Sequence, residues 1–509
     1  MQKWTPLFVV LAVVFSVDAH AKKRLIVKYK SGQMDKALSK ASFQAVSKST
    51  GLDRVIIKTN SDSDFEKMKA ELSSNPEVEY VEEDRVFNHF YEPGDGGTIE
   101  DQSYHQQWHY FENYGINAPA AWDVTLGSSS TVVAVVDTGI TSHPDLDGKV
   151  LPGADLISDP NFSNDGGGRD NDASDPGDFI QWGDTCYRGW PIDSSWHGTH
   201  VAGTIAAKTG NGTGVAGVNW NAKILPVRVL GKCGGYESDI ADGVRWAAGV
   251  SVSGVGTNPN PAKVINMSLG GQGPCSFTMQ NAINEANARG AVVVVAAGND
   301  NTNMNFTSYS PANCNGVLVV GASNRNGGRS YYSNYGNKVD IMAPGGDGSG
   351  SILSTHNSGQ KDPGFATYST MNGTSMAAPH VAGIASLIFA VKPGLYPAQV
   401  RDIIRNTAAN FPSSSNCTTS TCGHGLVDAY QAVVEAGVTT PDPNYRANDP
   451  TGVGGTAGSA PLYTYYEDDG AAGCGTIDTS GGSNGGPGGG SKMLGYLMMM
   501  LLGSFLVQA

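Results

Sequence analysis

Residues 373–383 read Gly-Thr-Ser-Met-Ala-Ala-Pro-His-Val-Ala-Gly. This stretch is typical of a loop that runs into a buried helix, because its small residues allow close packing against neighbouring elements. We place Pro379 in the first turn of this helix, where a missing N–H costs little. The helix N-terminus gives Ser375 a positive electrostatic environment. A serine hydroxyl becomes a good nucleophile only when a base removes its proton.

Two earlier stretches supply that base and its partner. Residues 132–139, Val-Val-Ala-Val-Val-Asp-Thr-Gly, predict an apolar strand that ends in the carboxylate of Asp137. Residues 197–204, His-Gly-Thr-His-Val-Ala-Gly-Thr, predict a helix that begins with the imidazole of His197. The order Asp, His, Ser is one of three orders in which serine triads occur in unrelated folds.

Together the three motifs closely resemble the subtilisin-like serine proteases (subtilases), from about Trp108 to about Ala436. The resemblance implies a secreted serine endopeptidase that hydrolyses peptide bonds in proteins through an acyl-enzyme. Ser375 would be the nucleophile, His197 the general base and Asp137 the carboxylate that orients the imidazole. Three other histidines are expected to be structural: His143, His200 and His380.

The resemblance also assigns residues that hold the substrate. Asn299, after the apolar run 291–296, would donate to the oxyanion of the tetrahedral intermediate, together with the Ser375 N–H. The stretch Ser268-Leu269-Gly270 would present a strand edge to an extended peptide, so the substrate should be an unfolded or loop segment of a protein. Ala297 and Gly298 are placed beside it.

Calcium is the cofactor that the resemblance implies, since hard oxygen ligands on loops suit this ion. Asp145 and Asn211 would bind through side chains, and three residues of the same loop would bind through carbonyls: Thr209, Thr213 and Val215. A second acidic cluster precedes His197 and is either another calcium site or a solvated acidic loop: Asp165, Asp170, Asp172 and Asp175.

Composition and the N-terminal residues limit the possible binding partners and indicate the cellular compartment. The net charge is −14 and Lys plus Arg total only 33 of 509 residues, which disfavours a nucleic-acid partner. We expect a monomer that acts on protein and peptide substrates. Residues 1–21 have Lys3, an apolar run and a small-x-small end, as secretory signal peptides do. Export permits disulfides.

Seven cysteines leave one without a partner. Pairing by proximity in the sequence predicts Cys417–Cys422, Cys275–Cys314 and Cys186–Cys233, with Cys474 left over, although the sequence alone does not fix this connectivity. A zinc site is disfavoured, because the chain has no C-x-x-C pair.

The chain alternates predicted strands and helices after residue 108, which indicates an α/β fold with a doubly wound parallel sheet. Apolar runs without alternation are typical of strands buried on both faces; they cover 131–136, 224–229, 264–267, 291–296 and 317–320. Predicted helices cover 238–250, 279–289, 375–391 and 397–407. Ligands in such sheets bind at the carboxyl ends of the strands, where Asp137, Ser268 and Asn299 fall.

The N-terminal part, from Arg24 to His89, predicts a small α+β domain with a βαββαβ order. It resembles the inhibitory propeptide of subtilases, which assists folding and blocks the active site, so the chain would be a self-processing zymogen. An ordinary domain kept in the mature protein is the alternative. Glu92 to Gly97 would be an exposed linker open to self-cleavage.

The expected boundaries are 1–21 for the signal peptide, 22–100 for the propeptide and linker, 101–437 for the catalytic domain, 438–490 for a flexible linker and 491–509 for an apolar C-terminal segment. The Gly-rich run and the apolar end resemble the GlyGly-CTERM sorting signal of Gram-negative exported proteins. A simple C-terminal anchor is the alternative, and either would allow transient membrane contact.

Two other functions are weighed against the protease. A surface adhesion protein that has lost turnover would explain an anchoring tail, but all three triad residues are present. An esterase or lipase is disfavoured because Ser375 lies in Gly-Thr-Ser-Met-Ala, which differs from the nucleophile elbow G-x-S-x-G.

Overall fold

The computed structural model describes residues 23–38, 45–49, 53–59, 61–84, 86–89, 92–93 and 103–442. The expected signal peptide, most of the linker before residue 103 and the C-terminal segments from residue 443 onward lie outside these ranges, and so does Cys474, the cysteine that the predicted pairing leaves over.

A seven-stranded sheet forms the centre of the large domain, and every neighbouring pair of strands in it is parallel. The strand order is β16-β15-β13-β11-β7-β9-β8. The bounds are β7 Val132–Asp137, β8 Ala154–Asp155, β9 Lys223–Arg228, β11 Val264–Met267, β13 Val292–Ala296, β15 Val317–Ser323 and β16 Ile341–Pro344. The five strands predicted from apolar runs are thus confirmed, and β8 and β16 extend the sheet at its two edges.

Both faces of the sheet are buried, which explains why its strands lack alternation. In β7, Val133 and Val135 belong to one hydrophobic cluster, whereas Ala134 and Val136 belong to another. Because successive side chains of a strand point to opposite faces, each face needs its own cover.

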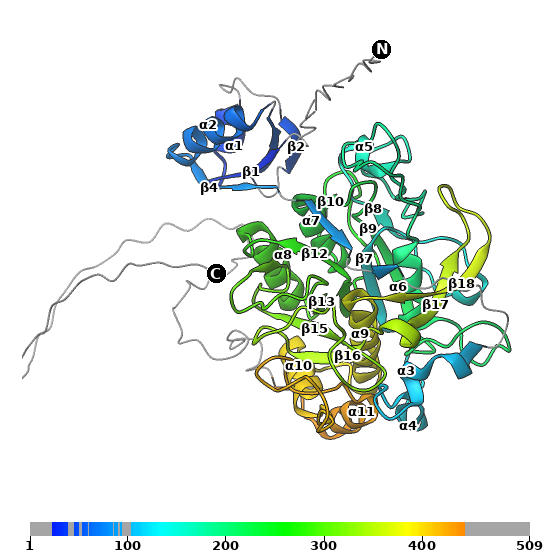
Figure 1. Cartoon of the computed structure of the whole chain (residues 1–509). Coiled ribbons are helices and arrows are strands. Elements are labelled where there is room, and N and C mark those ends of the chain that lie inside the picture. The colour runs from blue at the N-terminus through cyan, green and yellow to red at the C-terminus, as the bar shows by residue number, and fades with distance from the viewer. Residues whose placement is uncertain are drawn as a thin grey trace, which may run out of the picture. The chain divides into compact units, whose positions relative to one another are not determined.

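Helices supply that cover on both sides (Figure 1). Helices α6 (His197–Ala206), α9 (Thr374–Val391) and α11 (Ala429–Val438) contribute to the first cluster, and α7 (Glu237–Ala247) and α8 (Phe277–Ala288) contribute to the second. Helix α10 (Pro397–Asn406) also joins the first cluster. The doubly wound parallel α/β fold is therefore confirmed.

Helix α9 is the central helix of this arrangement. Its composition and length would suit a membrane span, but 89% of its 18-residue apolar window is buried inside the protein, as in a core helix. The helix begins at Thr374, so Pro379 is its sixth residue and our placement in the first turn is wrong. Pro379 cannot donate to the carbonyl of Ser375. The hydroxyl of Ser268 donates to that carbonyl instead, at 2.9 Å.

The N-terminal domain has the order β1 (Arg24–Tyr29), α1 (Met34–Leu38), β2 (Ala45–Ser49), β3 (Arg54–Lys58), α2 (Asp62–Ser73) and β4 (Val78–Glu83). Its sheet is antiparallel with the strand order β2-β3-β1-β4, as in ferredoxin-like folds. Phe65 and Leu72 of α2 pack on Leu25, Val27 and Ile57 of the sheet. The predicted small α+β domain is confirmed.

All three predicted disulfides are present: Cys186–Cys233, Cys275–Cys314 and Cys417–Cys422. The first joins the loop that precedes α6 to the segment that follows β9. Pairing by proximity succeeded here.

Candidate active site

Asp137 and His197 meet at the carboxyl edge of the sheet. Asp137 is the last residue of β7 and His197 is the first residue of α6. The Oδ1 atom of Asp137 lies 2.7 Å from Nδ1 of His197 and also accepts the N–H of Thr138 at 2.8 Å. Both side chains are fully buried. A carboxylate in this position selects the imidazole tautomer that leaves Nε2 able to accept a proton.

Ser375 is the second residue of α9, where the first backbone N–H groups have no partner within the helix. Its hydroxyl donates to the backbone carbonyl of Ser268 at 2.9 Å. The two serines thus bond each other twice, since the Ser268 hydroxyl holds the Ser375 carbonyl. These bonds tie the start of α9 to the residue that follows β11.

Asn299 lies three residues beyond β13 and faces the same helix N-terminus. Its Oδ1 atom accepts the N–H of Thr374 at 3.0 Å and the hydroxyl of Thr374 at 2.9 Å. Its Nδ2 atom is buried and makes no hydrogen bond to any residue that the structure describes. A buried donor without a partner is costly, and such a group is well suited to a developing oxyanion.

Two short strands of the N-terminal region pair with strands of the large domain near the candidate site residues. Strand β5 (Val86–His89) pairs antiparallel with β12 (Leu269–Gln272), with Leu269 opposite His89 and Gly270 opposite Asn88. Strand β6 (Glu92–Pro93) pairs antiparallel with β18 (Ala366–Asn372), with Asn372 opposite Glu92. Leu269 and Gly270 therefore pair with an extended segment of this same chain, and the pairing of this edge with a substrate stays a prediction. Glu92 and Pro93, which we expected in an exposed linker, form a paired strand.

Ala297 and Gly298, which the sequence places beside the substrate, have backbone groups that are bonded within the domain. The N–H of Ala297 donates to Val320 and its carbonyl accepts from the Asn334 side chain. The N–H of Gly298 donates to Thr374, and its carbonyl accepts the N–H of Asn334. Their backbone groups are thus engaged inside the domain, so they shape the site and do not pair with β5 or β6.

Comparison with known proteins identifies the architecture. The model of the subtilase family matches residues 128–430, and that of the fervidolysin N-terminal prodomain matches residues 16–84. The chain belongs to the subtilase family. Its N-terminal domain is accordingly a subtilase prodomain.

Two bacterial relatives of this subtilase are extracellular proteases. That of Xanthomonas campestris is 50% identical over 377 residues, which cover 74% of this chain and 62% of the relative. The extracellular basic protease of Dichelobacter nodosus is 43% identical over 453 residues, which cover 83% of this chain and 72% of the relative. A solved protease structure from Pseudoalteromonas arctica is 55% identical with a TM-score of 0.63, and the match covers 67% of this chain and all of that one.

The structure adds site residues that the sequence reasoning missed. Met371 and Asn372 of β18 pair with Pro93 and Glu92 of β6. Their place three and four residues before Ser375 was the available signal, but a strand pairing with the prodomain cannot be read from spacing alone.

The other histidines of the subtilase motifs have structural contacts. Nε2 of His200 contacts the carbonyls of Ile352 and Ser369 at 3.1 and 3.2 Å. His380 contacts the carbonyl of Met376 through Nδ1 and His109 through Nε2, both at 2.7 Å. Burial lowers the pKa of His200 well below its usual value, and nearby His356 lowers it further.

The expected calcium ligands Asp145, Asn211 and Val215 come together around one carboxylate. Asp145 is fully buried, and its oxygens accept the side-chain amide of Asn211 and the N–H of Val215, both at 2.9 Å. Within the described ranges no Lys or Arg forms an ion pair with it. Both contacts come from N–H groups, so Asp145 is a buried carboxylate satisfied by two donors, and calcium binding around it stays a prediction.

The second acidic cluster does not gather into one site. Asp165 pairs with Arg228 at 2.7 Å, and Asp170 and Asp172 accept N–H groups of their own turn. Asp175 accepts the hydroxyl of Thr138 at 2.8 Å and the N–H of Gly177 at 2.9 Å. Among the described residues no group of three or more His, Cys, Asp or Glu side chains is arranged to hold a metal. These four carboxylates therefore have separate structural partners.

The prodomain contacts the subtilase domain at the N-termini of two helices. Asp84 accepts the N–H and the hydroxyl of Ser238, near the start of α7, at 2.7 and 2.6 Å. Glu82 accepts the N–H groups of Phe277 and Thr278, at the start of α8, at 3.0 and 2.9 Å. Carboxylates in these positions satisfy orphan N–H groups and favour the positive end of each helix dipole.

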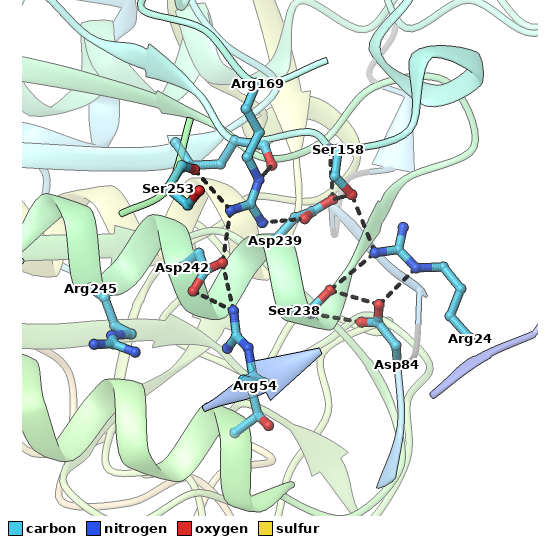
Figure 2. A network of polar contacts seen from close by, with 12 residues as sticks. Arg24, Arg54, Asp84, Ser158, Arg169, Ser238, Asp239, Asp242, Arg245 and Ser253 are labelled. Atoms are coloured by element: carbon cyan, nitrogen blue, oxygen red, sulfur yellow. Dashed lines mark hydrogen bonds and ion pairs between the residues drawn. The ribbon is translucent and has the colours of Figure 1, made fainter. Parts of the chain in front are cut away.

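Buried ion pairs surround the first of these caps (Figure 2). Arg54 of the prodomain donates to both oxygens of Asp242 at 2.7 Å, and Arg169 bridges Asp242 and Asp239 at 2.9 and 2.6 Å. Arg24 pairs with Asp84 at 2.9 Å. Burial raises the pKa of Asp242, but Arg54 and Arg169 outweigh that effect and hold it below its usual value.

Proposed function

We propose that the chain is the precursor of a secreted serine endopeptidase in which Asp137, His197 and Ser375 form the catalytic triad. The observation that carries the proposal is the Asp137–His197 contact of 2.7 Å at the carboxyl edge of the sheet, near the strands with which β5 and β6 pair. Extracellular relatives that are 43–50% identical support secretion and proteolysis.

Each of these residues then has its own role in the reaction. The Ser375 hydroxyl leaves the carbonyl of Ser268, attacks the peptide carbonyl and loses its proton to Nε2 of His197. Asp137 stabilises the imidazolium that forms. The Nδ2 atom of Asn299 and the N–H of Ser375 donate to the oxyanion. His197 then protonates the leaving amine, and water releases the acyl group by the same route in reverse.

The same register supports a proposal for the first self-cleavage. Strand β5 ends at His89 and strand β6 begins at Glu92, so only residues 90 and 91 lie between the two paired segments. In the sequence, the Phe90–Tyr91 bond lies midway between the last residue of β5 and the first residue of β6. We assign the first cut to this bond, after which the prodomain remains bound as an inhibitor until it is removed.

Calcium, oligomeric state and processing belong to the same proposal. Asp145, Asn211, Thr209, Thr213 and Val215 would hold one calcium ion that stabilises the domain. The mature enzyme would be a monomer, and trimming after the first cut would bring its N-terminus to the expected boundary at residue 101, with the catalytic domain ending at residue 437. The segment 491–509 would make transient membrane contact before its removal.

Self-processing tests the proposal. Purified wild-type precursor should convert to a product that begins at Tyr91 and that degrades casein, whereas Ser375→Ala should stay intact and inactive. N-terminal sequencing and intact mass give both readouts. Processing of Ser375→Ala would refute the triad, and a first product that begins at any residue other than Tyr91 would refute the assigned bond alone.

A further inference from the structure

One loop that precedes α6 holds two buried carboxylates that have no role in the proposed reaction. Residues 175–178 read Asp-Pro-Gly-Asp, and the side chains of Asp175 and Asp178 are only 2% and 8% exposed. Buried acidic groups need compensating hydrogen bonds or charges.

The first carboxylate reaches the residue after Asp137. Oδ2 of Asp175 accepts the hydroxyl of Thr138 at 2.8 Å. A hydroxyl has one proton, so the oxygen of Thr138 is left to accept, and it accepts the N–H of Gly198 at 3.0 Å. The N–H of Thr138 in turn donates to Asp137. Asp175 therefore fixes a hydroxyl that joins the turn after Asp137 to the residue after His197.

The second carboxylate reaches the other side of His197. Oδ1 of Asp178 accepts the N–H of Ser195 at 2.6 Å, and Oδ2 accepts its hydroxyl at 2.7 Å. The oxygen of Ser195 accepts the N–H of His197 at 3.3 Å. Since Trp196 between them has a left-handed backbone (φ 52°), the start of α6 depends on these bonds for its direction.

The loop itself has little room to shift. The N–H of Gly177 donates to Oδ1 of Asp175, and its carbonyl accepts the side chain of Asn164 at 2.9 Å. Gly177 has φ +101°, and a Cβ there would lie 2.0 Å from the carbonyl oxygen of Lys361. The two carboxylates are therefore held at a fixed separation.

We propose that Asp175 and Asp178 are positioning residues, which fix Asp137 and His197 relative to each other through the hydroxyls of Thr138 and Ser195. This inference rests on the proposed triad. It predicts a loss in the chemical step with little change in substrate binding, because the strands that pair with the N-terminal region, β12 and β18, make none of these contacts to Asp175 or Asp178. A purely structural role would lower the amount or the stability of folded enzyme and leave kcat per active site unchanged.

Removal of the Thr138 hydroxyl is the test. Thr138→Val keeps the side-chain shape, Thr138→Ser keeps the hydroxyl, and Asp172→Asn changes an exposed carboxylate of the same region as a control. Mature enzyme is counted by active-site titration, and kcat and KM are measured on a peptide anilide. We expect Thr138→Val to lower kcat about 10- to 100-fold, with KM within about twofold, as small misplacements of catalytic groups do. Thr138→Ser and Asp172→Asn should stay near wild type.

Two results would overturn the inference: an unchanged kcat in Thr138→Val, or an equal loss in Thr138→Ser. If Thr138→Val does not fold, Ser195→Ala replaces it as the test variant, because the N–H of residue 195 can still bind Asp178 while the hydroxyl is lost. A lower kcat in Ser195→Ala supports the inference, and an unchanged kcat overturns it. Ser375→Ala is processed in parallel. If it self-cleaves, the proposed function itself fails, whereas an intact Ser375→Ala beside a fully active Thr138→Val removes the positioning role alone.

Discussion

The side-chain oxygen of Asn299 accepts two hydrogen bonds from Thr374, the residue that precedes Ser375. Because Oδ1 is occupied in this way, Nδ2 must point elsewhere, and it is a buried donor without a partner among the described residues. The structure thus fixes the orientation of the amide before any substrate arrives.

The first prediction follows from that orientation. Asn299→Ala should lower kcat by about 10²–10³-fold, the range found when such a donor is removed from subtilisin, with KM little changed because the donor acts on the transition state. Steady-state kinetics on the mature enzyme measure both constants. If KM instead rises by this factor while kcat is preserved, the oxyanion role is contradicted.

The second prediction concerns the prodomain. Arg54→Met should raise the inhibition constant of the separate prodomain at least about 30-fold, since it removes one partner of a buried charge pair. Progress curves of peptide hydrolysis with added prodomain give this constant. Lys58→Met is the matched control: Lys58 lies 3.4 Å from Asp159, is 37% exposed and should change inhibition less than about threefold. Equal effects of the two variants would refute the role of the buried network.

The third prediction concerns calcium. A chelator should lower the Tm of the Ser375→Ala precursor, which cannot digest itself. Asp145→Ala should lower the Tm without chelator and should no longer respond to it, because the central carboxylate is gone. Asp172→Asn should respond as its parent does. An unchanged Tm in chelator would remove the calcium assignment, and a lost response in Asp172→Asn would move the ion to the acidic loop.

The fourth prediction concerns stability at low pH. Burial lowers the pKa of His380 to about 4, below the usual 6.5 of histidine. Between pH 6.5 and 4 the unfolded chain therefore binds a proton at this residue that the folded chain does not, so stability is lost as the pH falls through this window. His109, which contacts His380 at 2.7 Å, is shifted in the same direction by burial and by His380.

His380→Gln isolates this contribution in the Ser375→Ala precursor. It should lower the Tm at pH 7.5 through lost contacts, but the further fall of Tm down to pH 4.5 should be smaller than in the parent. Differential scanning calorimetry across this range gives the comparison. An equal or steeper fall in His380→Gln would contradict the assignment.

The sequence predicted the parts of the fold that depend on local pattern. Asp137 was found because an apolar strand ends in a carboxylate, and it is the last residue of β7. The three disulfides followed from proximity. The pairing of β5 and β6 with two separate edges could not be predicted in this way, since it joins Asn88 to Gly270 and Glu92 to Asn372 across long stretches of chain.

The errors at the site also have physical causes. Pro379 lies inside α9, although it has no N–H to donate to the carbonyl of Ser375. The hydroxyl of Ser268 donates to that carbonyl instead, and this contact joins residues 107 positions apart in the sequence. For Asp175 the sequence left two alternatives open, a second calcium site and a solvated acidic loop. The partner of Asp175, Thr138, lies 37 positions away, so only the fold reveals that this carboxylate supports the turn after Asp137.

The most direct test of the central claim is covalent labelling of the mature enzyme with a serine-directed phosphonate, followed by mass spectrometry of its peptides. We expect one adduct per molecule, on Ser375, with loss of activity in proportion to labelling. A fully active enzyme that takes up no label, or an adduct on another serine, would contradict it.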